Sequence, residues 1–145
     1  MKEECINAYI LRVNSEGIQY RGYFASLENS LKAKQELVGG NIEVVRITPE
    51  IDAIINEEGK LRCLPMNRLW TDGSGETYDL LVGNIVCVRH NEEGEFTSIL
   101  ETDKKIIDQL LIPIKGLYEL ERENNITQRV IFVRPDEDLL NYKEG

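Results

Sequence analysis

The chain has 145 residues, of which 41% are hydrophobic and 7% aromatic, and these values exclude a disordered protein because enough apolar surface is available for one core. The chain has 17 Lys and Arg against 26 Asp and Glu, which gives a formal net charge of −9. This negative charge repels the phosphates of nucleic acid and so opposes non-specific binding to it. No apolar run approaches the roughly 18 residues that a membrane span requires.

The first 25 residues predict a β-hairpin. Residues 8–13 (AYILRV) and 18–25 (IQYRGYFA) are rich in the branched and aromatic residues typical of strands. Gly17 ends the Asn-Ser-Glu-Gly segment between them and tolerates the positive φ that such a turn needs. The two segments are therefore expected to pair with each other.

An amphipathic helix is predicted over residues 27–38. Its leucines and its valine gather on one side at about 100° per residue, and its charged residues fall on the other. Ser26 is the expected N-cap, and Gly39 and Gly40 are expected to end the helix. Residues 41–47 (NIEVVRI) then have the composition of a strand.

The tetrapeptide Asn-Glu-Glu-Gly occurs twice, at residues 56–59 and 91–94. Asn at the first position of a type I turn bonds to the backbone two residues on, and Gly at the fourth accepts the left-handed conformation of a bulged hairpin. A calcium loop would instead need oxygen ligands spread over about a dozen residues. Both copies are therefore predicted to be hairpin corners whose glutamates face solvent.

Residues 64–84 (LPMNRLWTDGSGETYDLLVGN) are predicted to be the longest irregular stretch inside the domain, and long ordered loops carry function more often than short ones. Arg68 offers a planar fork of donors, Asn67 a donor and an acceptor, and Trp70 a flat stacking surface. These three residues suit a nucleobase, a phosphate-bearing small ligand or a partner protein. The structural alternative is that Trp70 fills the core while Arg68 bonds to backbone carbonyls at a chain reversal.

After residue 101 the pattern changes to a short helix and a second hairpin. Thr102 is the expected N-cap of the helix, and Pro113 cannot continue it. The hairpin is expected to turn at Asn124 and Asn125, and its second strand is the stronger one. Residues 136–145 are expected to form a loosely held acidic tail.

These elements predict an α+β fold. It is a mainly antiparallel, hairpin-rich sheet with one amphipathic helix packed on it and a short C-terminal helix plus hairpin. Residues 1–103 are expected to form the core, and residues 104–145 an extension packed on the same domain. The strand order is not readable from the pattern, so barrel-like and open sheets both remain compatible with it.

Catalytic motifs are missing from the sequence. It has no Gly-x-Ser-x-Gly, His-Glu-x-x-His or phosphate-binding loop. The one histidine, His90, flanks a turn and is interpreted as an ordinary surface residue. The three cysteines lack the spacing of a zinc site. No catalytic residue, no metal site and no cofactor is therefore predicted.

Three segments carry a family resemblance: LKAKQELVGGNIEVVRI, INEEGKLRCLPMNRLW and YDLLVGNIVCVRHNEEGEFTSIL. In this order and spacing they resemble an uncharacterised domain family of phages, plasmids and other mobile elements, the domain of unknown function 3846, over roughly residues 8–103. The resemblance implies a small accessory protein of a mobile element. It implies no catalytic residue, and it draws attention to Asn67 and Arg68, which match the family's Asn-Arg pair.

The leading hypothesis for function is a non-enzymatic binding protein, with a counter-defence role that sequesters a nucleotide-type signal or blocks a host defence protein. Its partner would be a host protein or a small nucleotide-like ligand, without direct binding to nucleic acid or membrane, and self-association is compatible with exposed sheet edges. An acidic DNA mimic is the first alternative. A metal-dependent nucleotide hydrolase using Asp72, Glu76 or Asp79 is the second. The acidic N-terminus lacks the features of a signal peptide, so a cytoplasmic location is expected.

Overall fold

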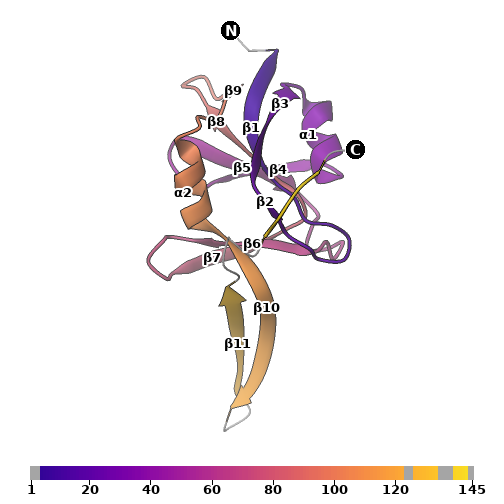
Figure 1. Ribbon diagram of the computed structural model, residues 1–145, viewed down its shortest axis with the longest axis vertical. Helices are drawn as coiled ribbons and strands as arrows, with labels where there is room; N and C mark the ends of the chain where they lie inside the picture. The colour runs from indigo at the N-terminus through magenta and orange to yellow at the C-terminus, as the bar shows by residue number, and fades with distance from the viewer. Residues whose placement is uncertain (1–3, 123–125, 134–138, 144–145) are drawn as a thin grey trace.

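The computed structural model describes residues 4–122, 126–133 and 139–143, and between residues 115 and 133 it describes the backbone (Figure 1). Antiparallel strands dominate, and helices make up a small part of the described chain, so the α+β class is confirmed. Neither described helix has the length and apolar character that crossing a membrane would require. The elements are β1 (Cys5–Leu11), β2 (Tyr20–Arg21), β3 (Tyr23–Glu28), α1 (Leu31–Val38), β4 (Ile42–Arg46), β5 (Ile51–Asn56), β6 (Met66–Thr71), β7 (Thr77–Val82), β8 (Ile85–His90), β9 (Phe96–Thr97), α2 (Asp103–Leu110), β10 (Leu111–Arg122), β11 (Ile126–Val133) and β12 (Leu140–Asn141).

The first sheet has the strand order β3-β1-β8-β5-β4, and β9 pairs with the end of β8. Because successive residues of a strand point to opposite faces, this sheet separates two clusters of buried residues. One cluster packs beneath α1 and includes Ile54, Val86 and Val88. The other lies on the opposite face, where Ile107 of α2 and Leu81 of β7 join residues such as Cys87.

The second sheet has the order β11-β10-β6-β7. In Figure 1, β6 and β7 lie across the lower end of the first sheet, α1 and α2 flank that sheet, and the β10–β11 hairpin extends downward from the rest of the molecule. β10 pairs with β6 through its first residues and with β11 along the rest of its length. The predicted second hairpin is thus present, although its expected turn residues, Asn124 and Asn125, lie outside the described residues.

The predicted helix over residues 27–38 is wrong in its first turn, because α1 begins at Leu31. Leu27 and Glu28 instead continue β3 and pair with β1. Ser30 is the N-cap, and its side chain accepts a hydrogen bond from the backbone N–H of Ala33. Capping and strand pairing therefore outweigh the helical periodicity of the first residues.

The two Asn-Glu-Glu-Gly segments are both turns, but they do different things. Asn91–Gly94 joins β8 to β9 as a hairpin, and Gly94 has a φ of +80°, as predicted. Asn56–Gly59 joins strands of different sheets, so the prediction of a hairpin there is wrong. Gly59 does not have a positive φ, and a Cβ on it would lie 2.8 Å from Val82 Cγ2, so close packing explains this glycine.

The prediction that residues 64–84 are irregular is also wrong, because β6 and β7 form an antiparallel hairpin there. Residues 72–76 form its loop. The carboxylate of Asp72 organises this loop by accepting hydrogen bonds from the backbone N–H groups of Ser74 and Glu76. These bonds lower the pKa of Asp72.

Helix α2 and the C-terminal segment also differ in detail from expectation. The Thr102 side chain makes no capping hydrogen bond, and the carboxylate of Asp103 instead accepts one from the backbone N–H of Leu100. Part of the acidic tail lies outside the described residues, whereas residues 139–143 are described, and two of them, Leu140 and Asn141, pair with β2. The described part of the tail is therefore attached to the body of the molecule.

The Gly94→Ala variant is expected to lose about 1 kcal/mol of unfolding free energy, because a φ of +80° is unfavourable for a residue with a Cβ. A Cβ placed on Gly94 would have no neighbouring atom within 4 Å, so strain of the backbone and not a clash is responsible. Urea denaturation measures the loss. Gly94→Asn is the matched control and should lose less, because Asn adopts this conformation more readily. Equal losses would contradict the explanation.

Candidate functional site

The sequence-predicted residues Asn67 and Arg68 lie in the interior, with exposed fractions of 0% and 2%. The amide nitrogen of Asn67 donates to the backbone oxygens of Leu11 and Gly83, both at 2.8 Å. The guanidinium of Arg68 donates to Asn67 Oδ1 at 2.7 Å and to the backbone oxygen of Tyr20 at 2.7 Å. These bonds tie together four segments of the chain, which is the structural alternative anticipated for Arg68.

Trp70 is half-buried, and it packs against the core cluster beside α2. Its ring lies 4.9 Å from that of Tyr78, centroid to centroid. Its indole Nε1 is buried and has no hydrogen-bond partner among the described residues. The structure thus brings the three predicted residues into one hairpin but holds Asn67 and Arg68 away from the surface, and their role in recognition stays a prediction.

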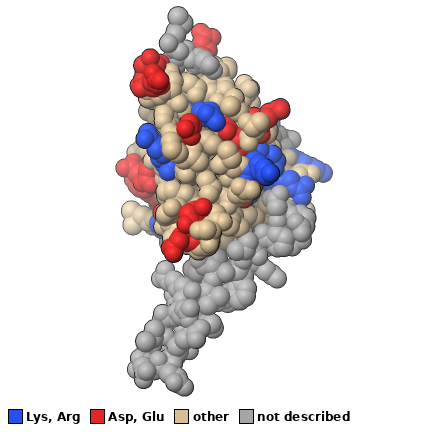
Figure 2. Space-filling view, turned by 90° about the vertical axis from the view of Figure 1, so that its left-hand side faces the viewer, with Lys and Arg blue, Asp and Glu red and all other residues tan. Residues whose placement is uncertain are grey.

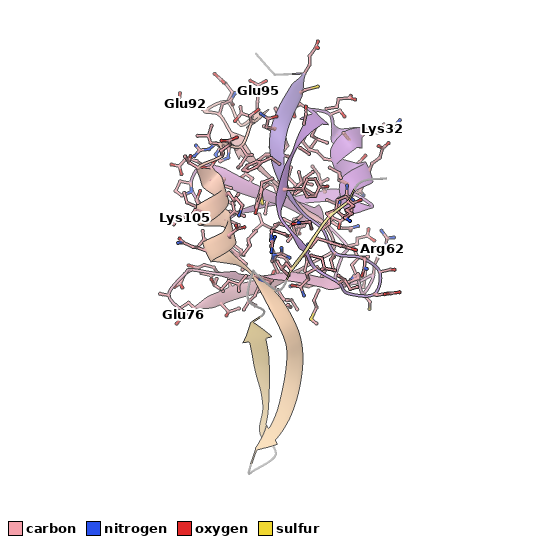
Figure 3. All side chains as sticks on the ribbon, in the orientation of Figure 1. Lys32, Arg62, Glu76, Glu92, Glu95 and Lys105 are labelled. Carbon is pink, nitrogen blue, oxygen red and sulfur yellow. The ribbon has the colours of Figure 1, made fainter. Side chains whose placement is uncertain are left out.

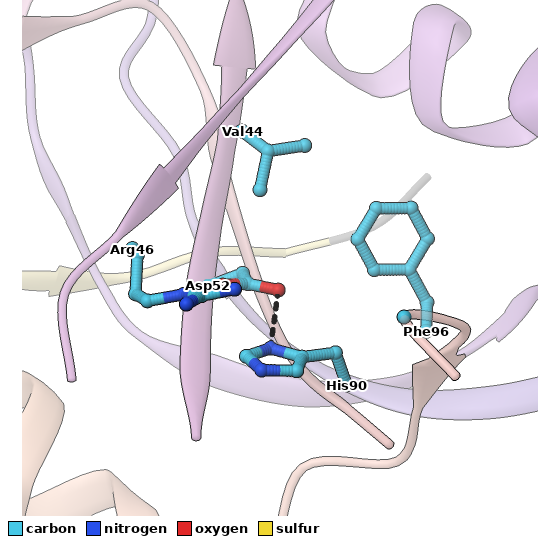
Figure 4. A pocket seen from close by; sticks show the side chains of 6 residues that line it. Val44, Arg46, Asp52, His90 and Phe96 are labelled. Atoms are coloured by element: carbon cyan, nitrogen blue, oxygen red, sulfur yellow. Dashed lines mark hydrogen bonds and ion pairs between the residues drawn. The ribbon is translucent and has the colours of Figure 1, made fainter. Parts of the chain in front are cut away.

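A different group of polar residues lines an open depression of about 480 Å³ on the α1 face of the first sheet (Figure 4). The strand register explains why they meet. Arg46 and Val88 are the neighbours of Asp52 on the adjoining strands, and His90 pairs with Phe96. Residues that pair across neighbouring strands share a face of the sheet, as do residues two apart on one strand. His90 is two residues after Val88 on β8, so its side chain lies on the same face as that of Asp52. We call this feature the Asp52–His90 depression; its lining residues are Val44, Arg46, Asp52, His90, Gly94 and Phe96.

Asp52 and His90 form a side-chain pair at its centre. Nδ1 of His90 lies 2.9 Å from Oδ2 of Asp52 (Figure 4), and the side chains of His90 and Asp52 are 16% and 5% exposed, respectively. Because a carboxylate accepts, Nδ1 carries the proton of this bond, and the bond fixes the orientation of the imidazole ring. Nε2, at the other side of the ring, has no protein partner among the described residues and remains for a ligand or solvent.

The second oxygen of Asp52, Oδ1, is buried without a hydrogen-bond partner among the described residues. Arg46 forms a long ion pair with this oxygen, with Nε at 4.0 Å from it, and the Arg46 side chain is 67% exposed. A buried carboxylate oxygen without a close donor is rare and costly in a folded protein. The depression therefore combines an exposed guanidinium, an oriented imidazole and an under-satisfied carboxylate.

The sequence reasoning missed this site because it assigned His90 to the surface. The available signal was Asp52 in the segment IDAII, where an acidic residue stands within a run of apolar ones. A buried strand is expected to exclude a carboxylate unless a partner holds it. The identity of that partner is set by the pairing of β5 with β8, which the local pattern does not contain.

The acidic residues of the hydrolase hypothesis do not gather into a metal-binding group. Asp72 bonds within its own loop, and Asp79 forms an ion pair with Lys60. Among the residues that the structure describes, no three acidic, histidine or cysteine side chains are placed to hold a metal ion.

Comparison with known proteins gives one family. Residues 8–111 match the domain of unknown function DUF3846, which is most of the chain, so the protein belongs to this family. Neither a curated protein nor a solved structure matches the chain. The match contains every residue that lines the Asp52–His90 depression. It ends at Leu111, the first residue of β10, so the rest of the β10–β11 hairpin and the C-terminal segment lie beyond it.

Proposed function

We propose that this member of the DUF3846 family is a non-enzymatic binding protein for a small nucleotide-type ligand, which it holds in the Asp52–His90 depression. The observation that supports the proposal is the convergence of Arg46, the oriented ring of His90 and the ring of Phe96 on one open space. A guanidinium suits the fork of a phosphate, and an imidazole nitrogen adds a second polar contact. An aromatic ring suits stacking with a base.

The chemistry of the site fits sequestration better than a protein–protein contact. The depression is concave, and its polar groups are few and convergent, which is typical of small-ligand sites. In the context that the resemblance implies, an accessory protein of a mobile element could act against host defence by removing a nucleotide signal. Binding alone is sufficient for such a role.

Titration calorimetry with a panel of linear and cyclic nucleotides tests the proposal. At least one nucleotide should bind the wild type, and Arg46→Ala and Phe96→Ala should each weaken that affinity about tenfold, through loss of the phosphate contact and of the stacking surface. Lys105→Ala is the charge-matched control, because Lys105 is an exposed cation of α2, which packs on the opposite side of the sheet (Figure 3). Its affinity should equal that of the wild type.

Two results would count against this function. If no nucleotide of the panel binds, or if both site variants bind as the wild type does, the depression is not a nucleotide site. If the nucleotide is converted to a product, and Asp52→Asn abolishes the conversion, the Asp52–His90 pair is an acid–base pair and the protein is an enzyme.

The DNA-mimic alternative draws on the net charge of −9. On the face shown in Figure 2, acidic and basic side chains are interspersed over the described surface. An imitation of a DNA backbone would instead favour a continuous acidic stripe. The distribution of charge on this face therefore favours the nucleotide site over mimicry.

A further inference from the structure

The described part of the C-terminal tail is bound to β2 as an extra strand. Leu140 and Asn141 of β12 pair in parallel with Tyr20 and Arg21. Figure 1 shows this yellow segment beside β2. Leu139, just before the strand, is 5% exposed. The attachment thus combines a two-residue backbone ladder with one buried apolar side chain.

Tyr142 completes the attachment in an aromatic cage. Its ring stacks on that of Tyr23 at 5.4 Å with an interplanar angle of 12°, and it meets Tyr20 edge-on at 5.4 Å. The guanidinium carbon of Arg12 lies 4.5 Å from the centroid of the Tyr142 ring. Arg12 is itself held in place, because its Nε donates to the Tyr23 hydroxyl at 2.8 Å.

The surface that receives the tail is held by contacts that do not involve the tail. The N–H of Tyr20 donates to the backbone oxygen of Arg12, and the carbonyl of Tyr20 accepts from Arg68. Gln19, the preceding residue, exchanges two hydrogen bonds with the backbone of Ile114. A site that is formed before its ligand arrives needs little reorganisation on binding.

We propose that Arg12, Tyr20, Arg21 and Tyr23 form a peptide-docking site, which the C-terminal segment of the same chain fills as an internal ligand. The site would take an extended peptide with the sequence chemistry of residues 140–142, namely an apolar residue, Asn and Tyr. Strand addition supplies the backbone hydrogen bonds of such a site, and the cage selects the aromatic side chain. The ladder covers two residues, and Leu140 is 61% exposed, so a free peptide of this type displaces the tail.

This proposal is independent of the nucleotide site. The docking residues belong to the part of the chain that matches the family, whereas the tail lies beyond it. The Asn67–Arg68 pair acquires a positioning role in this arrangement, because Arg68 fixes the carbonyl of Tyr20 behind the docking surface.

A fluorescein-labelled peptide of residues 137–145 tests the proposal by fluorescence anisotropy with the full-length chain. Tyr142→Ala should bind the peptide about tenfold more tightly than the wild type, because the internal tail no longer competes for the site. A peptide with alanine in place of its tyrosine should not bind. Adding Arg12→Ala to the Tyr142→Ala chain should remove binding of the unaltered peptide.

Two further full-length variants separate docking from a change in folding. Tyr142→Phe keeps the stacked ring and should behave as the wild type, and so should Lys143→Ala, which alters an exposed neighbour. Circular dichroism should show the same fold for all variants. Equal peptide affinity for the wild type and Tyr142→Ala, or binding to neither, would overturn the proposal and identify the tail as a permanent part of the fold.

Discussion

The Asn67→Leu variant is expected to lose roughly 3–4 kcal/mol of unfolding free energy, the largest effect foreseen for a single side chain here. The substitution preserves the approximate volume but leaves the buried carbonyl oxygens of Leu11 and Gly83 without their donor. It also removes the side-chain oxygen that accepts from Arg68, whose charge is almost fully buried. Each lost partner of a buried polar group costs about 1–3 kcal/mol, and a charged group costs more.

Urea denaturation followed by circular dichroism measures this loss. Asn41→Leu is the matched control, because Asn41 is exposed and its side chain makes one long hydrogen bond, at 3.3 Å, to Gln35. That control should change the unfolding free energy by less than about 0.5 kcal/mol. A loss for Asn67→Leu as small as that of the control would show that the interior hydrogen bonds do not stabilise the junction of the strands.

The Asp103→Asn variant is expected to lose about 2–3 kcal/mol at neutral pH. Asp103 is 1% exposed, and its two oxygens accept from Nε and Nη2 of Arg89 at 2.7 and 2.8 Å. One oxygen also accepts from the backbone N–H of Leu100 at the start of α2. An amide offers one acceptor in place of two and no charge, so Arg89 would be left with a poorer partner.

The same pair makes stability depend on pH. The hydrogen bonds from Arg89, followed by the bond from Leu100, lower the pKa of Asp103 in the folded protein. The stabilisation is therefore complete above the unfolded-state pKa of about 3.9, and it is lost as the pH falls through the lower pKa of the folded state. The unfolding free energy of the wild type should fall more steeply below pH 4 than that of Asp103→Asn.

Urea denaturation at pH 7 and at successive acidic pH values checks both parts of this expectation. Glu92→Gln removes the same charge from an exposed turn (Figure 3) and should follow the wild type at every pH. If the difference in unfolding free energy between the wild type and Asp103→Asn stays constant down to acidic pH, protonation of Asp103 is not the cause of the pH dependence.

The sequence pattern predicted the elements whose signal is local. The opening hairpin with Gly17, the turn at Gly94 and the strand after the Gly39–Gly40 pair are all present. Each depends on residues within a few positions of one another, where turn chemistry and strand composition act. The class of the fold followed from these elements.

The errors arose where distant pairing decides the structure. Asn56–Gly59 has the same four letters as Asn91–Gly94, yet it leads into a different sheet because β6 pairs with β7 and β10. Its asparagine donates to the carbonyl of Val38 at the end of α1, a bond that no local pattern reveals. Residues 66–71 were missed as a strand because the buried Asn67 and Arg68 break the expected alternation of apolar and polar residues.

The candidate site was less predictable than the fold. Asn67, Arg68 and Trp70 were selected for their chemistry, but chemistry alone does not tell a ligand-facing side chain from one that bonds to the backbone inside the protein. Asp52 and His90 lie 38 positions apart, and the register of two neighbouring strands joins them. One sequence without that register leaves them as unrelated residues.

The place of β8 between β1 and β5 has a consequence for synthesis and folding. β1 and β5 each pair with β8 and not with each other, so the first sheet stays divided into two separate hairpin units until residue 90 has left the ribosome. Ladders that join distant segments form slowly, since the intervening loop must close first. We therefore expect the late insertion of β8 to limit the folding rate. A nascent chain that ends before β8 should expose the unpaired edges of β1 and β5, which chaperones can bind.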